Sequence, residues 1–141
     1  MALWRFLDYV TDDSRVPIEE WVSNHLEPAE RAAFDVVVDY LGRIDDWDEV
    51  RKSSRKYCEL KRQLVGLTEL KFATVTQAMG KNHKKQFRPL GILKRLERQF
   101  IFLGGFQKSN PGPIPINAYT DALSYKKEYE QNRGDLREHK T

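Results

Sequence analysis

The sequence lacks the features that mark secreted and membrane proteins. Its one cysteine, Cys58, cannot form a disulfide within the chain, which is typical of proteins from a reducing cytoplasm. No stretch approaches the roughly 20 apolar residues that span a membrane, the best candidate being the short "FIFLGGF". No basic segment followed by an apolar one opens the chain. We therefore expect a soluble, cytoplasmic protein with no membrane partner.

The sequence also lacks the motifs of several common enzyme classes. Neither the phosphate-binding pattern GxxxxGK nor the nucleophile pattern GxSxG occurs. His25, His83 and His139 are scattered, with no cysteine or carboxylate neighbour at the spacing of a metal site. A lone cysteine such as Cys58 is more often a small buried residue than a nucleophile. We expect no metal and no cofactor.

Length and charge narrow the range of functions. The 141 residues suffice for one hydrophobic core but not for two, so we predict a single domain over residues 1–141. Residues 1–50 carry 4 Lys+Arg and 13 Asp+Glu, a net charge of −9, whereas residues 51–108 carry 15 and 3, a net charge of +12. This basic middle part has two interpretations, which composition alone does not separate. It is either a solvated face balanced by the acidic N-terminal part or a surface that binds a polyanion.

Periodicity and turn residues predict an α+β fold. Alternation and apolar runs indicate strands at 3–10, 66–75, 87–94 and 98–106, and the last is apolar on both faces, as in a central strand. Helices are predicted over 18–24, from Pro28 to about residue 44, and over 117–134. The second of these is expected to bury one apolar stripe, made of Ala33, Val36, Val37, Tyr40, Leu41 and Ile44. We expect a long hairpin loop around Gly80, a bulge or edge position at Pro89 and Gly91, a proline-rich loop over 108–117 and a frayed tail from residue 135. Residues 51–63 fit either a short helix or irregular structure. The order of elements predicts a small antiparallel β-sheet packed against two N-terminal helices, with a C-terminal helix.

Within the basic part, three cations occur on or beside strands. Lys71 belongs to the charged face of an alternating strand, Arg88 begins the next strand, and Lys108 follows the apolar one. Antiparallel pairing would bring them onto one face, about 5 to 10 Å apart. Because like charges at such distances repel, this arrangement favours a bound phosphate.

Four segments follow one another over about residues 60–130: "LTELKF", "QFRPLGIL", "QFIFLGGFQKS" and the helix "NAYTDALSYKKEY". In this order they resemble the RelE/HigB superfamily of bacterial toxins, and most closely its phage-derived HigB-like branch. The resemblance implies a RelE-like fold and a toxin of a type II toxin–antitoxin pair. Such toxins cleave mRNA, usually on the ribosome, by attack of the ribose 2′-hydroxyl on the adjacent phosphate, without a metal. The implied partner is a small antitoxin, with a helix-turn-helix domain in the expected case.

The resemblance also assigns roles to individual residues. Arg88 would stabilise the phosphorane, Lys71 would neutralise phosphate or accept the 2′ proton, and Lys108 would stabilise the leaving group. Tyr119 or Tyr125 would donate a proton or stack on a base, unless both only anchor the helix on the sheet. We predict Lys71, Arg88, Lys108 and Tyr119 as catalytic residues, and Lys84, Lys85 and Tyr125 as RNA-binding residues.

A different class of function is the alternative. The same basic block, residues 51–108, would then bind RNA or a protein partner without catalysis. On the enzyme hypothesis, Arg88→Ala is expected to abolish toxicity without unfolding the domain.

Overall fold

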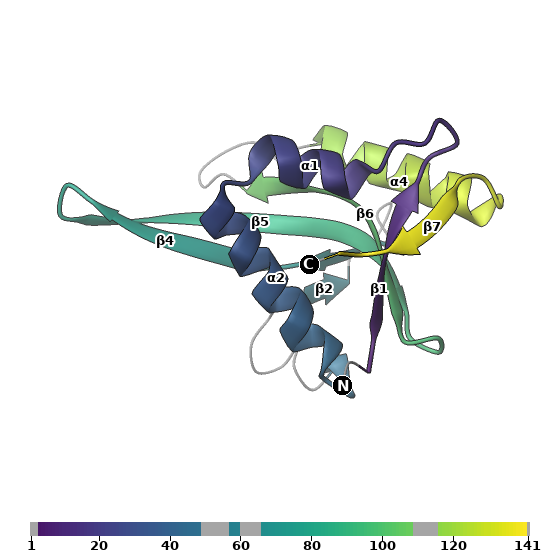
Figure 1. The fold of residues 1–141 in the computed structure, drawn as a ribbon, viewed down its shortest axis with the longest axis horizontal. Coiled ribbons are helices and arrows are strands. Elements are labelled where there is room, and N and C mark those ends of the chain that lie inside the picture. The colour runs from purple at the N-terminus through teal and green to yellow at the C-terminus, as the bar shows by residue number, and fades with distance from the viewer. Residues whose placement is uncertain (1–2, 49–56, 60–65, 109–115, 141) are drawn as a thin grey trace.

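The computed structural model describes residues 3–48, 57–59, 66–108 and 116–140, and shows an α+β fold (Figure 1). The proline-rich segment 109–115, most of 51–63 and the side chain of Cys58 lie outside the described residues. The part of 51–63 that is described, Tyr57–Glu59, is a strand and not the short helix or irregular structure that the sequence left open. The elements follow in the order β1 (Arg5–Val10), α1 (Pro17–His25), α2 (Pro28–Gly42), β2 (Tyr57–Glu59), β3 (Thr68–Leu70), β4 (Phe72–Ala78), β5 (Lys81–Lys94), β6 (Gln99–Lys108), α4 (Ile116–Glu130) and β7 (Asp135–Glu138). None of the described helices is long and apolar enough to cross a membrane.

All strands of the described residues join one sheet. The sheet is mixed, whereas the sequence predicted an antiparallel one. The order of strands is β2-β3-β5-β6-β1-β7, and β4 pairs with β5 beyond the end of β3. The exception to antiparallel pairing is the ladder between β1 and β6, which is parallel. Alternation of apolar and polar residues says which face a strand buries but not in which direction its neighbour runs. The sequence therefore predicted the strands but not this pairing.

The strand β6 lies between β5 and β1 and is buried on both faces, as its sequence predicted. Phe100 and Phe102 pack with side chains of α1 and α2, whereas Ile101 and Leu103 pack with side chains of α4. The two N-terminal helices and the C-terminal helix therefore cover opposite faces of the sheet.

The helix α2 begins at Pro28, as predicted, but its buried face is turned from the predicted one. Glu27 and Glu30 form a capping box at its first turn, which fixes the start of the helix. Val37 and Leu41 are buried, as predicted, but Val36, which was expected inside, is 67% exposed, and Phe34 and Val38 are buried in addition. Both sets of residues have helical spacing, so spacing alone could not choose between two adjacent faces.

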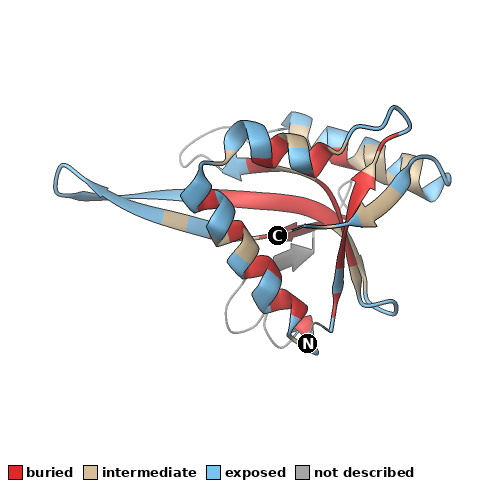
Figure 2. Cartoon of the chain, in the orientation of Figure 1, coloured by how far each residue is buried: buried red, intermediate tan, exposed pale blue. Residues whose placement is uncertain are grey.

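The β4–β5 hairpin closes with a two-residue turn, and the longer loop expected here is wrong. Met79 and Gly80 have φ values of 54° and 76°, as in the primed turns that match the twist of paired strands. Pairing continues from Phe72↔Phe87 to Ala78↔Lys81. The hairpin projects from the body of the protein as an arm, at the left of Figure 1, and Figure 2 shows its outer part exposed.

The C-terminal tail is ordered, contrary to the fraying that the sequence predicted. It forms β7, which pairs antiparallel with β1, and the backbone N–H of His139 donates to the carbonyl of Phe6 at 2.9 Å. The carboxylate of Asp12 accepts hydrogen bonds from the backbone of Gly134 at 2.6 Å and from Nε of Arg133 at 2.8 Å. The partners are more than 100 residues apart in the sequence, so local pattern could not reveal them.

Tyr9 gives the fold a pH dependence at alkaline pH. Burial and the nearby carboxylate of Glu128 raise the pKa of Tyr9 from 10.0 to about 12. Its hydroxyl donates to Glu128 at 3.2 Å and to the carbonyl of Arg133 at 3.3 Å. The protonated form is thus favoured in the folded state, and its stabilisation is present below pH 10 and lost as pH rises through about 12.

We expect Tyr9→Phe to remove this alkaline loss of stability. Between pH 10 and 12, the free energy of unfolding of the wild type should fall by up to about 3 kcal/mol relative to Tyr9→Phe. Urea denaturation at several pH values measures the difference, with Tyr40→Phe as the control at an exposed tyrosine. Parallel pH profiles for the wild type and Tyr9→Phe would contradict the prediction.

Candidate functional site

The site begins at a break between β3 and β4. The sequence predicts one strand here, but the ladder is interrupted at Lys71. The register with β5 is the same on both sides of the break, so Lys71 lies opposite Arg88. The next residue of β5 is Pro89, which has no N–H to donate and cannot complete the ladder. Two cations therefore lie side by side across the strands, at the break in the ladder.

A β-bulge brings Lys108 to the same face. Between Leu90 and Gly91 of β5 the register with β6 shifts, which leaves Leu103 of β6 as an extra residue. An extra residue exchanges the faces of all residues beyond it, because side chains alternate along a strand. Lys108 therefore shares the α4 face with Arg88, and its Cα partner is Gln86, two residues before Arg88.

Glu69 lies at the centre of this cluster. Its Oε1 is 3.2 Å from Nε of Arg88, and both side chains are buried. Arg88 also donates from Nη2 to Oε1 of Gln86 at 2.7 Å and from Nη1 to the carbonyl of Phe87 at 3.0 Å. The hydroxyl of Tyr119 on α4 forms a further hydrogen bond with the Glu69 carboxylate. Arg88 is thus held by protein groups on several sides, and its closest charge is a carboxylate.

The electrostatics of Glu69 are a balance of opposing effects. Burial raises the pKa of the Glu69 carboxyl above its ordinary value, although Arg88, Lys71, Lys108 and the hydrogen bond with Tyr119 act in the opposite direction. A carboxylate with a raised pKa is a better proton acceptor than an exposed one. We call this set the Glu69 cluster: Glu69, Lys71, Gln86, Arg88, Lys108 and Tyr119.

Members of the Glu69 cluster differ in access to solvent. Arg88 and Glu69 are 7% and 8% exposed, whereas Lys71 and Tyr119 are half-buried and Lys108 is exposed. Tyr119 packs edge-on against Phe106, with ring centroids 5.2 Å apart. The lysines and the tyrosine are therefore the groups that a ligand meets first.

The structure brings together the four predicted catalytic residues but not all the predicted RNA-binding residues. Lys84 shares the α4 face of β5 and lies exposed on the arm. Lys85 lies on the opposite face, where its Nζ is 3.2 Å from Glu30 of α2, because consecutive residues of a strand alternate. Tyr125 packs against Tyr9 at a centroid distance of 5.9 Å, about 9 Å along α4 from Tyr119.

The prediction from sequence missed Glu69 and Gln86. Alternation already placed Glu69 on the same face as Lys71, so a signal was present. A phosphate site is recognised in a sequence by its cations, so the prediction gave no role to the carboxylate between them. Among the described residues, no three histidine, cysteine, aspartate or glutamate side chains form a group that could hold a metal ion.

Comparison with known proteins adds no relative. No family model, curated protein or solved structure matches the chain. The likeness to RelE/HigB toxins thus consists of the sequence segments alone.

Proposed function

We propose that this protein is a metal-independent endoribonuclease that cleaves RNA by attack of a ribose 2′-hydroxyl on the adjacent phosphorus. The observation that carries the proposal is the buried carboxylate of Glu69, held on one face of the sheet with Lys71, Arg88, Lys108 and Tyr119. Cleavage of this kind requires a proton acceptor, positive charge around the phosphorane and a proton donor for the leaving oxygen. The cluster contains a group for each requirement.

In this mechanism, Glu69 accepts the proton of the 2′-hydroxyl as the 2′-oxygen bonds to phosphorus. Lys71 and Lys108, the accessible cations, stabilise the charge on the phosphorane oxygens. As the bond from phosphorus to the 5′-oxygen breaks, Tyr119 gives its proton to that oxygen, leaving a 2′,3′-cyclic phosphate. The hydrogen bond between Glu69 and Tyr119 then returns the proton from the carboxyl to the phenolate.

Arg88 has a different role in this proposal from the one that the family resemblance implies. Its guanidinium contacts Glu69, Gln86 and the backbone and is only 7% exposed. We therefore assign Arg88 as a positioning residue, which holds Glu69 ionised and in place for proton transfer.

The charge of the arm supports RNA as the substrate. The sequence has no Asp or Glu between Glu69 and Glu97, and the exposed Lys84 of the arm lies on the same sheet face as the cluster. Such a surface attracts a phosphate backbone. A type II toxin acting on mRNA at the ribosome, in the cytoplasm and under control of an antitoxin, is the setting that the motif resemblance favours.

The second candidate function is a non-catalytic RNA- or protein-binding module. The burial of both Glu69 and Arg88 favours it, because a buried ion pair also occurs for purely structural reasons. Both candidates bind RNA through phosphates, so salt dependence does not separate them.

The test of the proposed function is the chemistry of the RNA ends. Purified protein is incubated with RNA, with and without translating ribosomes, and the fragments are analysed for 2′,3′-cyclic phosphate. We expect such ends, and we expect a single 2′-deoxy nucleotide at a cleavage site to block the cut there. RNA binding without cyclic phosphate ends under either condition would reject the enzyme in favour of the binding module.

A further inference from the structure

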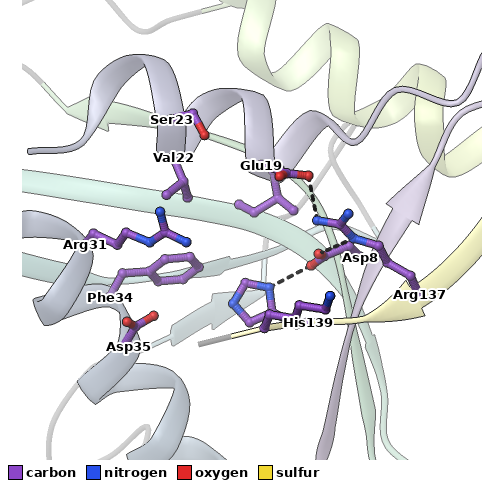
Figure 3. Close-up of a pocket in the computed structure, with 11 residues that line it drawn as sticks. Asp8, Glu19, Val22, Ser23, Arg31, Phe34, Asp35, Arg137 and His139 are labelled. Carbon is purple, nitrogen blue, oxygen red and sulfur yellow. Dashed lines mark hydrogen bonds and ion pairs between the residues drawn. The ribbon is translucent and has the colours of Figure 1, made fainter. Parts of the chain in front are cut away.

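A cavity of about 170 Å³ lies on the opposite face of the sheet from the Glu69 cluster (Figure 3). It is bordered by α1, α2, β1 and the segment at β7. One side is apolar, and we call Ile18, Val22 and Phe34 the apolar wall. This volume is large enough for a small organic ligand.

A buried Asp–His pair forms the floor of the cavity. Asp8 is 1% exposed, and its Oδ1 lies 2.7 Å from Nδ1 of His139. Its other oxygen accepts from Nε of Arg137 at 3.1 Å, and Arg137 also contacts Glu19 at 2.7 Å. Phe102 packs on the imidazole ring, with centroids 4.7 Å apart, and fixes its orientation. The histidine is therefore held rigidly, with one nitrogen committed to Asp8.

The other nitrogen of His139 has no partner among the described residues. Nε2 is buried, and the side chain of His139 is 8% exposed. Figure 3 shows this side of the ring turned toward Phe34 and away from Asp8, and the two ring centroids are 5.5 Å apart. Since Nδ1 donates its proton to Asp8, Nε2 either accepts a proton from a ligand or donates one as imidazolium. In either state, Nε2 can form a hydrogen bond with an acidic group, with one proton between the two.

The charges around the cavity select the kind of acid. Arg31 and Lys140 line it together with Asp35, whereas Arg137 is already paired with Asp8 and Glu19. One anionic charge near Nε2 and Arg31 would be favourable, but a dianion would meet the nearby carboxylates. The apolar wall further favours a ligand with a short hydrocarbon part over an inorganic ion.

We propose that this cavity binds a small organic carboxylate, whose acid group lies at Nε2 of His139 and Arg31 and whose hydrocarbon part packs on the apolar wall. This site is independent of the proposed ribonuclease activity, because no residue is shared with the Glu69 cluster. A ligand here would add to the contact that Arg137 of β7 already makes with Glu19 of α1.

The test uses butyrate, which has six non-hydrogen atoms, and follows the imidazole nitrogen signals of His139 by NMR. We expect a saturable shift of Nε2 with a dissociation constant of about 1 mM, as suits so small a ligand. Arg31→Gln should weaken binding about tenfold or more. Arg43→Gln, at the exposed C-cap of the same helix and outside the lining of the cavity, should leave it unchanged.

Three outcomes would overturn the proposal. The first is no saturable shift of His139 at butyrate concentrations about tenfold above the expected constant. The second is equal weakening by Arg31→Gln and Arg43→Gln, which would indicate a general charge effect. The third is inorganic phosphate binding as tightly as butyrate, which would show that the apolar wall has no part in recognition.

Discussion

Arg88→Ala should lower the free energy of unfolding by about 3–5 kcal/mol at pH 7, because it leaves the buried carboxylate of Glu69 without its closest cation. Lys71 and Lys108 act on the same carboxylate but are more exposed to solvent and cannot replace the direct contact. The expectation from sequence, that this substitution leaves the domain folded, did not include such a loss of stability. Urea denaturation followed by circular dichroism measures it.

A double-mutant cycle separates the buried charge from the loss of packing. Adding Glu69→Gln to Arg88→Ala should restore about 2 kcal/mol, because no unpaired charge is then buried. The cost of Arg88→Ala should also shrink as pH falls below the raised pKa of Glu69, where the carboxyl is protonated. Arg43→Ala, which breaks an exposed ion pair with Asp39, is the control and should cost less than about 1 kcal/mol. A change of less than about 1 kcal/mol for Arg88→Ala would show that Glu69 does not depend on it.

The sequence predicted most helices and strands because their signals are local. Pro17 and Pro28 mark the starts of α1 and α2, and the apolar run at 99–106 marks β6. The irregularity expected from Pro89 and Gly91 is confirmed, although the extra residue belongs to β6. The parallel ladder of β1 and β6 and the ordering of β7 depend on contacts between distant segments, which no local pattern encodes.

The candidate site was also predictable only in part, because local signals reveal some of its residues and pairing between strands decides the rest. The common face of Lys71, Arg88 and Lys108 was predicted from antiparallel pairing, but Lys108 reaches that face only through the bulge at Leu103. Lys85 falls on the other face because it is one residue away from Lys84 along the strand. His139 was not predicted as a site residue because it has no cysteine or carboxylate neighbour at the spacing of a metal site, whereas pairing of β1 with β7 brings it to Asp8.

These observations make Glu69 a more informative position than Arg88 for a mutational test of catalysis. Substitution of Arg88 changes stability and activity together, so lost activity would not identify a catalytic role. Glutamine has the size of glutamate, keeps hydrogen-bonding groups for Arg88 and Tyr119, and carries no charge to bury. Glu69→Gln therefore tests proton transfer with the least disturbance of the fold.

Glu69→Gln should reduce the rate of RNA cleavage about 10²- to 10⁴-fold, the range typical for loss of a general base. RNA binding should be retained or slightly tighter, since a negative charge among cations is removed. In the wild type, the acid limb of the pH–rate profile should lie above the ordinary range of a glutamate, because burial raises the pKa of Glu69. Rates and affinities measured on one oligonucleotide with a defined cleavage site give both quantities.

Glu97→Gln supplies the matched control, because Glu97 is exposed in the turn between β5 and β6 and carries the same change. Its cleavage rate should equal that of the wild type within about twofold. If Glu69→Gln cleaves as fast as Glu97→Gln, the proton acceptor is another group, and the carboxylate is structural. If Glu69→Gln loses affinity as much as rate, the carboxylate organises the lysines that bind phosphate and does not accept the 2′ proton, because a general base acts on the chemical step and leaves binding intact.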